Sequence, residues 1–207
     1  MTGSANVSLS AFEKQLVTDT SWILTKNNII QKVFVMFGEL SEAFQSNAAL
    51  KQLPSVIAEI SPKISKGENY QGLPYVILDY PRCFSKEDVF AVRTFFWWGN
   101  FFSITLHLKG KYKQQFEQAI ADAVRAGELN NAWMNVSDNE WIHHFEDTNM
   151  LPVQLTKADS LQQNNILKLA YKLELNQWDD AEEFLKKIFD QYMLLLTHYF
   201  QYGETDL

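Results

Sequence analysis

Apolar and polar residues alternate most regularly between Tyr70 and Gly110, and this two-residue period is typical of β-strands. Strand-forming residues are concentrated in three runs within this stretch, at about 75–80, 88–98 and 101–109. Gly99 and Asn100 separate the last two runs, which predicts that they form an antiparallel hairpin. We therefore expect the rest of the chain, which is mostly helical in pattern, to cover a sheet built around this hairpin.

The register of the hairpin follows from the faces that each turn would create. A two-residue turn at Gly99-Asn100 would pair residues of opposite parity and place His107 on the same face as Val92. A three-residue loop that begins at Trp98 keeps residues of equal parity together. Because a one-residue slip moves every side chain to the other face, several burials of about 1.5–3 kcal/mol each favour the second register. We expect Asn100 to take the left-handed conformation in this loop.

The three-residue loop gives the sheet two chemically different faces. The expected core face carries Phe90, Val92, Thr94, Phe96, Phe102, Ile104, Leu106 and Leu108. The opposite face carries Ala91, Arg93, Phe95, Trp97, Ser103, Thr105, His107 and Lys109. In the preceding strand, alternation places Val76, Leu78 and Tyr80 on the core face and Tyr75, Ile77 and Asp79 on the other.

Apolar residues at three- and four-residue steps predict helices before, within and after the sheet region. The predicted helices cover about 11–17, 22–46, 111–126, 159–174 and 179–202. Ser10 and Glu13 have the spacing of a capping box, which satisfies two backbone N–H groups at the start of a helix. A further helical segment at 48–60 is interrupted by Pro54.

Glycine, proline and short polar residues predict the connections between these elements. The glycines and prolines between positions 62 and 74 predict a loop before the first strand. The turn-forming residues at 137–139 separate two short strand candidates, at 132–136 and 140–145. We expect these two strands to form a second hairpin that extends the sheet.

These elements predict a single α+β domain over residues 1–207, with an antiparallel sheet of about five strands. The central hairpin is 88–98/101–109, and the N-terminal, middle and C-terminal helices are expected to pack on the sheet. Residues 1–10 and 203–207 are expected to be flexible ends.

Composition and charge narrow the classes of function. The 207 residues are 46% hydrophobic and 21% charged, which is typical of a folded globular protein. The formal net charge is −7 and lysines and arginines do not cluster, so we expect no nucleic-acid partner. The first residues lack the pattern of a signal peptide, and no apolar window is long enough to span a bilayer. We therefore expect a cytoplasmic protein with no membrane partner.

The mixed face of the central sheet is the candidate binding site. Its expected ligand-binding residues are Asp79, Arg93, Phe95, Trp97, Ser103, Thr105 and His107. Polar groups that converge between aromatic walls are typical of a small-molecule or peptide pocket. Arg93 could clamp a carboxylate or phosphate, and His107 could act as an acid or base near neutral pH. The alternative interpretation is that Asp79 and Arg93 pair at the sheet surface, with His107 as a half-exposed strand residue.

Other reactive residues do not form a recognisable site. His143 and His144 precede Glu146, but adjacent strand residues point to opposite faces and cannot both bind one ion without distortion, so we expect no metal. Cys83 is the only cysteine, which excludes an intramolecular disulfide and a cysteine-based zinc site. Beside Phe84, it is interpreted as a small buried hydrophobe rather than a nucleophile. The chain has no nucleophile elbow, phosphate-binding loop, dinucleotide-binding motif or zinc-protease motif, and we expect no cofactor.

Three hypotheses of function follow from these observations. The leading hypothesis is a non-catalytic protein that binds a small molecule or a protein partner with the face around Arg93, Trp97 and His107. The second is an enzyme without a linear motif, in which His107 is the acid/base and Arg93 holds an anion. The third is a homodimer that associates through exposed aromatic residues at the Trp97-Trp98 hairpin tip.

Overall fold

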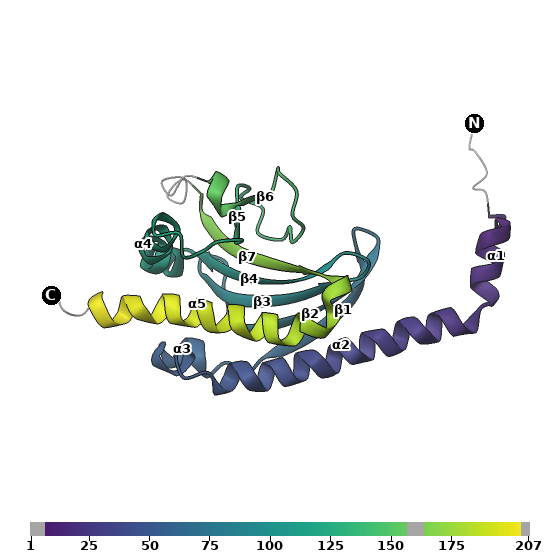
Figure 1. Cartoon of the computed structure of the whole chain (residues 1–207), viewed down its shortest axis with the longest axis horizontal. Coiled ribbons are helices and arrows are strands. Elements are labelled where there is room, and N and C mark those ends of the chain that lie inside the picture. The colour runs from purple at the N-terminus through teal and green to yellow at the C-terminus, as the bar shows by residue number, and fades with distance from the viewer. Residues whose placement is uncertain (1–6, 157–163, 204–207) are drawn as a thin grey trace.

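The computed structural model of the chain describes residues 7–156 and 164–203, and these residues are organised around one antiparallel sheet (Figure 1). Among the residues described, the sheet has seven strands in the order β1-β2-β3-β4-β7-β5-β6. The strands are β1 (Lys63–Tyr70), β2 (Leu73–Phe84), β3 (Val89–Trp97), β4 (Phe101–Lys109), β5 (Trp133–Asn135), β6 (Met150–Pro152) and β7 (Ile166–Glu174). The α+β class is confirmed, whereas the expected number of about five strands is wrong.

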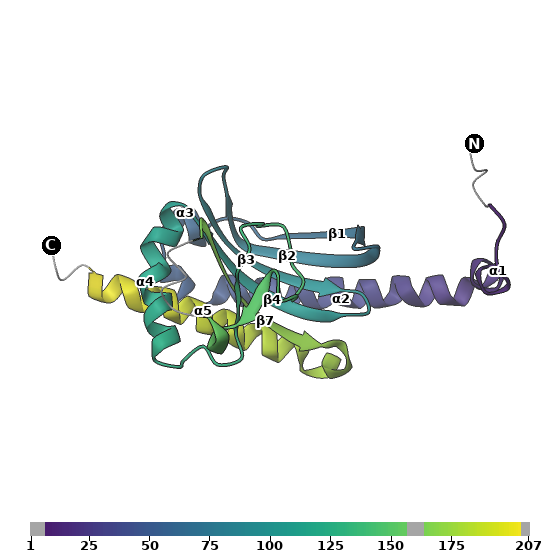
Figure 2. The ribbon, with the colours of Figure 1, turned by 90° about the horizontal axis from the view of Figure 1, so that it is seen from above.

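The helices pack mainly on one face of this sheet (Figures 1 and 2). They are α1 (Ala11–Thr18), α2 (Thr20–Ser46), α3 (Ser55–Ala58), α4 (Lys111–Arg125) and α5 (Ala181–Gly203), with short 3-10 turns η1 (Leu50–Gln52), η2 (Val153–Leu155) and η4 (Leu175–Asp180). The Phe44 ring of α2 stacks on the Phe189 ring of α5 with centroids 3.8 Å apart. The predicted helices at 11–17, 22–46, 111–126 and 179–202 are confirmed, and η1 and α3 flank Pro54 in the interrupted segment.

The register predicted for the central hairpin is confirmed. Trp97 is opposite Phe101, so the loop is Trp98-Gly99-Asn100 and residues of equal parity share a face. All eight residues predicted for the core face of β3 and β4 are buried. The prediction that Asn100 is left-handed is wrong, because Gly99 takes the positive φ of 73° instead. Glycine adopts that conformation without steric cost, so it provides the turn.

The first helices extend beyond the sheet and form what we call the helical arm, residues 11–29 (Figures 1 and 2). The capping box of α1 is present, since Ser10 and Glu13 exchange side-chain and backbone hydrogen bonds. No residue of α1 is buried, and the first buried residue of α2 is Ile30. None of the helices among the residues described is long and apolar enough to cross a membrane.

The loop predicted between positions 62 and 74 is wrong, because residues 63–70 form the edge strand β1. An edge strand with little burial needs no apolar alternation, so its sequence lacks the pattern by which strands are recognised. Gly67 of this strand packs directly against the Tyr75 ring of β2, which leaves no room for a side chain at that position. The glycine that suggested a loop is therefore explained by close strand packing.

The helix predicted at 159–174 is also wrong over the residues described, because β7 occupies 166–174; the part of the prediction at 159–163 lies outside them. Leu169 and Leu173 are four residues apart, which imitates a helical stripe. In the strand, residues 167, 169, 171 and 173 face the helices, and Lys168, Ala170 and Lys172 lie on the other face. In the sheet, β7 pairs with β4 on one side and with β5 on the other.

The second hairpin is formed by a different pair of strands from those predicted at 132–136 and 140–145. Strand β5 pairs with β6 and β7, whereas residues 140–145 form no strand and belong to an irregular segment. We call residues 136–149 the covering segment, because its side chains contact the sheet face opposite the helices. The flexible ends expected at 1–10 and 203–207 lie mostly outside the residues described.

Candidate functional site

The mixed sheet face predicted from the sequence lies under the covering segment rather than at an open surface. We call the buried and partly buried charged and imidazole groups there the polar cluster: Asp79, Arg93, His107, His143 and Lys168. Strands β2, β3, β4 and β7 each contribute one of these residues, and the covering segment contributes the histidine at 143. The prediction that strand alternation gathers Asp79, Arg93 and His107 on one face is therefore correct, and the structure adds a cover.

Arg93 forms a two-point ion pair with Asp79, its partner in the register of β2 and β3. Its Nε donates to Oδ1 at 2.7 Å and its Nη2 donates to Oδ2 at 2.9 Å. The remaining Nη1 donates to Nε2 of His143 at 2.9 Å. This pairing was the alternative interpretation of the sequence, but it is buried, since Asp79 is only 7% exposed. In forked arginine pairs of this kind, the geometry fixes the orientation of the guanidinium.

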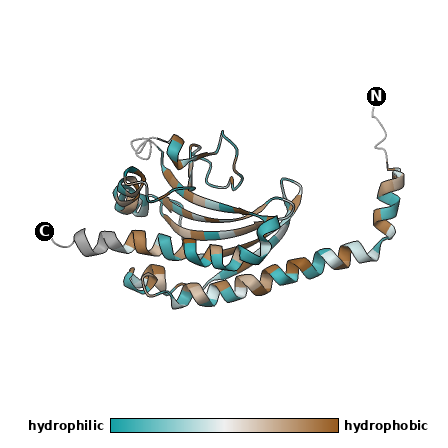
Figure 3. Cartoon of the chain, in the orientation of Figure 1, coloured by the Kyte–Doolittle hydropathy of each residue, from teal (hydrophilic) through white to brown (hydrophobic). Residues whose placement is uncertain are grey.

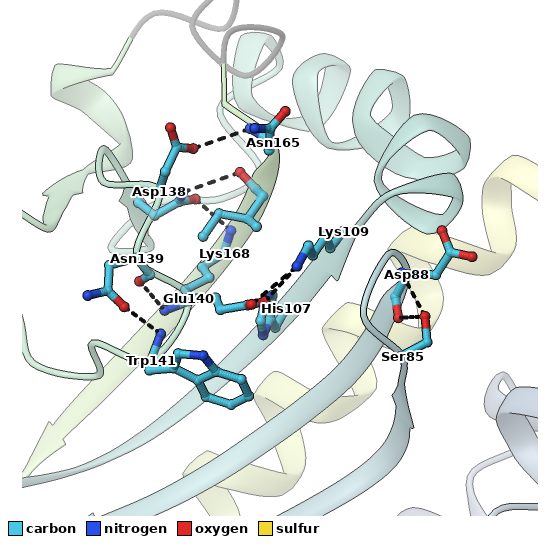
Figure 4. Close-up of polar contacts among 12 residues, drawn as sticks. Ser85, Asp88, His107, Lys109, Asp138, Asn139, Glu140, Trp141, Asn165 and Lys168 are labelled. Carbon is cyan, nitrogen blue, oxygen red and sulfur yellow. Dashed lines mark hydrogen bonds and ion pairs between the residues drawn. The ribbon is translucent and has the colours of Figure 1, made fainter.

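His107 is buried, and its ring nitrogen Nε2 has no hydrogen-bond partner. Oε2 of Glu140 lies 3.6 Å from this nitrogen, which is beyond hydrogen-bond length (Figure 4). Burial, followed by the positive charges of Lys168, Arg93 and Lys109, lowers the pKa of His107 to about 3. At neutral pH the ring is therefore neutral, so it cannot serve as a general acid there, and it is not the half-exposed strand residue that the sequence suggested.

The other histidine of the cluster is neutral for similar reasons. Burial, and then the neighbouring Arg93, lower the pKa of His143 well below its ordinary value of 6.5. Because Nη1 of Arg93 donates to Nε2 of His143, Nε2 is the acceptor and the ring proton is on Nδ1 of the same histidine. Its neighbour His144 contacts the hydroxyl of Tyr70 instead, with Nδ1 at 3.0 Å. The two histidines thus have separate partners, and no group of three or more potential metal ligands occurs among the residues described.

Lys168 is the member of the cluster that sequence reasoning missed. The residue is only 2% exposed, and Nζ donates to the backbone carbonyl of Ile142 at 2.9 Å. Nζ also donates to the carbonyl of Asn139 at 3.3 Å (Figure 4). Burial, and then the charge of Arg93, lower its pKa to about 7, although Glu140 acts in the opposite direction. The alternation of apolar residues from 167 to 173 was the signal that could have placed it on the sheet face.

Two cavities of about 10 Å³ each lie within the polar cluster and its surroundings. Thr105, His143 and Lys168 line both, and Arg93 and His107 line the first. A water molecule needs roughly 10–15 Å³ of such space, so each cavity has about the size of one water. An organic ligand therefore requires the covering segment to move.

The aromatic part of the predicted site packs as a separate core. Phe95 and Trp97 form an apolar cluster with Ile77 and Phe101, and neither lines the cavities of the polar cluster. Ser103 is 1% exposed and is likewise absent from their lining. Of the seven residues predicted to bind ligand, the structure thus places Arg93, Thr105 and His107 beside a cavity of the polar cluster, while Asp79 pairs with arginine.

Polar contacts hold much of the covering segment to the sheet. The Tyr70 hydroxyl accepts a hydrogen bond from the backbone N–H of His143 at 2.7 Å. Glu140 accepts one from Nζ of Lys109 at 3.2 Å, and the Lys168 bonds fix two backbone carbonyls of the segment. Trp141, at its centre, is 58% exposed. The Phe145 ring of the segment also packs on Phe101 and Trp133, so opening the segment breaks aromatic as well as polar contacts.

Cys83 is half-buried at the end of β2, and its Sγ lies 3.2 Å from the carbonyl of Val56. Burial raises its pKa above the ordinary value, against the smaller effects of Lys111 and Arg82. A raised pKa disfavours the thiolate that a nucleophile needs.

Searches with protein-family models, among curated proteins and among solved structures found no match to this chain. The function is therefore argued from the geometry.

Proposed function

We propose that this protein is a non-catalytic binding protein for a small carboxylate or phosphate ion, which is held between the sheet and the covering segment. The observation that carries the proposal is the buried Nε2 of His107, which has no hydrogen-bond partner. The ring lies beside Lys168, whose amine has a pKa of about 7. Perturbed titratable groups next to a cavity are enriched at functional sites. The proposal retains the leading sequence hypothesis and narrows it to an anion.

The charges of the polar cluster favour a negative ligand. Arg93 is paired with Asp79, and Lys109 is paired with Glu140, so protonated Lys168 adds one positive charge with only carbonyl acceptors. An anion next to this amine would stabilise its charged form and raise its pKa. Binding near neutral pH is therefore expected to be accompanied by proton uptake.

The ligand would enter by displacement of the covering segment. Opening this segment would release Nζ of Lys168 from the carbonyls of Asn139 and Ile142 and expose Arg93 and Thr105. The same donors would then be available to the oxygens of the ligand, as in charge-assisted recognition of carboxylate or phosphate. Closure would exclude water and strengthen these contacts.

The test is calorimetric titration with acetate, succinate and inorganic phosphate in two buffers of different ionisation enthalpy. Wild-type protein is expected to bind at least one of these anions with proton uptake at pH 7.5. Lys168→Met is expected to weaken binding by roughly tenfold or more while it leaves the fold intact, since it removes a costly buried charge. Lys66→Met, an exposed lysine of β1, is the control. An absence of binding, or equal binding by Lys168→Met, would refute the proposal.

A second candidate function, self-association, is favoured by the helical arm, which carries hydrophobic residues (Figure 3) whose side chains are exposed. The exposed fractions are 65% for Phe12, 36% for Leu16, 71% for Val17, 49% for Trp22, 42% for Ile23 and 59% for Leu24. At the hairpin tip, by contrast, Trp97 is 8% exposed and Trp98 packs against the main core, so that tip offers no aromatic anchor. If the protein is a homodimer, the arm is the better interface.

A second copy of this chain is the occupant that the charges of the arm favour. Its residues 11–29 carry Glu13, Lys14, Asp19 and Lys26, which sum to zero, whereas the whole chain has a net charge of −7. Two copies can therefore meet through their arms with less repulsion than elsewhere. Light scattering across a range of concentrations should show a dimer that Trp22→Ser dissociates. Trp97→Ser tests the hairpin, and a monomer at every concentration would exclude both interfaces.

A further inference from the structure

An open pocket of about 390 Å³ lies beside the β3–β4 turn. Trp97, Phe101 and Phe145 provide its aromatic lining, and Glu146, Lys172 and Glu174 are among its charged lining residues. It shares no residue with the cavity beside His107, and it shares Phe145 with the second small cavity of the polar cluster. Its volume is within the range of pockets that bind a small organic molecule.

Three aromatic rings surround one ammonium group next to this pocket. Nζ of Lys172 lies 6.0 Å from the centroid of the Phe101 ring, 5.6 Å from that of Trp133 and 5.7 Å from that of Phe145. All three distances are within the range in which a ring face attracts a cation. We call these three rings the aromatic cage.

The rings of the cage support one another in nearly perpendicular orientations. Phe145 lies 5.1 Å from Phe101 at an interplanar angle of 84°, and 5.4 Å from Trp133 at 82°. They come from β4, β5 and the covering segment, three parts of the chain that are distant in sequence. Phe145 is thus nearly perpendicular to each of the other two rings, and several aromatic rings around one point are the arrangement that recognises quaternary ammonium ions.

The charges around the cage also favour a cation. Oε1 of Glu174 lies 3.3 Å from Nζ of Lys172, and Glu146 lines the same pocket with 70% of its side chain exposed. A lysine ammonium is strongly hydrated, and aromatic rings offer it no hydrogen-bond acceptors to replace water. A quaternary ammonium ion donates no hydrogen bonds, so it loses less hydration when it enters the same cage.

We propose that Phe101, Trp133 and Phe145 form a binding site for a small quaternary ammonium ion, and that Lys172 occupies this site until the ligand displaces it. The side chain of Lys172 is 32% exposed and its stem is flexible, so Nζ can move into solvent while it remains near Glu174. The carboxylates of Glu146 and Glu174 then attract the incoming cation. The lysine acts as an internal competitor that weakens binding.

The test is calorimetric titration with tetramethylammonium chloride, with sodium chloride at equal ionic strength as the salt control. The wild-type protein should bind weakly, and Lys172→Ala should bind about tenfold more tightly because the competitor is removed. Lys66→Ala, an exposed lysine on β1, should bind like the wild type. Trp133→Leu and Phe145→Leu should abolish saturable binding, and circular dichroism verifies that each variant folds.

Choline and Nε-trimethyl-lysine then distinguish two sources of the same chemical group. Tighter binding of choline identifies a choline compound as the ligand class, and tighter binding of trimethyl-lysine identifies a methylated side chain; either result supports the cage. The proposal is overturned if Lys172→Ala binds tetramethylammonium no better than the wild type. It is also overturned if folded Trp133→Leu and Phe145→Leu retain the affinity of the wild type, since the ion would then bind elsewhere.

Discussion

His107 and His143 are buried beside positive side chains, so the folded protein holds both rings neutral at pH values where the unfolded chain protonates them. The pKa of His107 is about 3, and that of His143 lies well below 6.5. The unfolded state therefore binds more protons than the folded state as the pH falls below 6.5. The stability that depends on these neutral histidines is fully present above pH 6.5, and it is lost as the pH falls from there toward 3.

We predict that the free energy of unfolding falls by up to about 1.4 kcal/mol per pH unit for each of these histidines between pH 6.5 and 5. His107→Asn should reduce this dependence of the unfolding free energy on pH by the contribution of one proton. Urea unfolding at several pH values measures the unfolding free energy, and the range lies above the pH at which most carboxylates titrate.

Thr94→Val is the control for this measurement. Thr94 is fully buried on the helix-covered face, and its hydroxyl has no hydrogen-bond partner. Removing that hydroxyl should increase stability by about 1 kcal/mol at every pH, because an unpaired buried polar group is costly. A slope that His107→Asn leaves unchanged would contradict the assignment of acid sensitivity to this ring.

Strand alternation alone placed three polar-cluster residues on one face, whereas the other two depended on contacts between distant segments. Asp79, Arg93 and His107 belong to strands whose period is regular, so their shared face could be predicted. Lys168 lies in a strand whose leucines also fit a helical period. His143 lies in a segment without regular structure, and nothing local in its sequence specifies that it meets Arg93.

At the level of elements, the pattern of apolar and polar residues predicted strands correctly where one strand face is mostly apolar. It was misleading at the edges of the sheet. The central strands are buried on both faces, but their polar residues keep a strict two-residue spacing. Edge strand β1 is mostly polar and was mistaken for a loop, because its place depends on backbone pairing with β2. Short strand β6 likewise pairs with β5 across the whole covering segment, a contact that local propensity does not encode.

Two glycines provide a matched prediction about how elements begin and pack. Gly110 precedes α4 with a φ of 60°, and a Cβ atom there would collide with the side chain of Asp88 and the backbone of Glu87. Gly110→Ala should cost at least about 2 kcal/mol of unfolding free energy, since strain from the positive φ adds to that collision. A Cβ atom at Gly38 in α2 would have no neighbouring atom within 4 Å, so Gly38→Ala should stabilise by about 0.5–1 kcal/mol.

Chemical denaturation of both alanine variants against the wild type measures the two effects. Asp88 also accepts a hydrogen bond from the backbone N–H of Lys111 at 2.9 Å, so a displaced carboxylate would leave the start of α4 without this contact. A Gly110→Ala variant as stable as the wild type would show that the connection before α4 can relax.

In the whole molecule, the sheet is enclosed on one face by helices and on the other by the covering segment, while the helical arm lies outside both layers (Figure 2). One apolar stripe runs along α2, and its C-terminal part, which includes Phe37, is buried against the sheet. The arm continues in apolar residues that stay exposed in the part of the chain that the structure describes, although Lys26 near its end pairs with Glu68 of β1. Burial, rather than sequence, therefore distinguishes the two parts of the N-terminal region.

Phe12 and Phe37 test this distinction with the same residue type. Phe37 is completely buried and Phe12 is 65% exposed. Phe37→Ala should cost about 3–5 kcal/mol, whereas Phe12→Ala should change the stability of the monomer by less than about 0.5 kcal/mol. Urea unfolding at low protein concentration measures both, and a large loss in Phe12→Ala would show that the arm packs on its own chain. If two arms pair instead, the melting temperature of the wild type should rise with protein concentration, and Phe12→Ala should remove that dependence because the partner stabilises only the folded state.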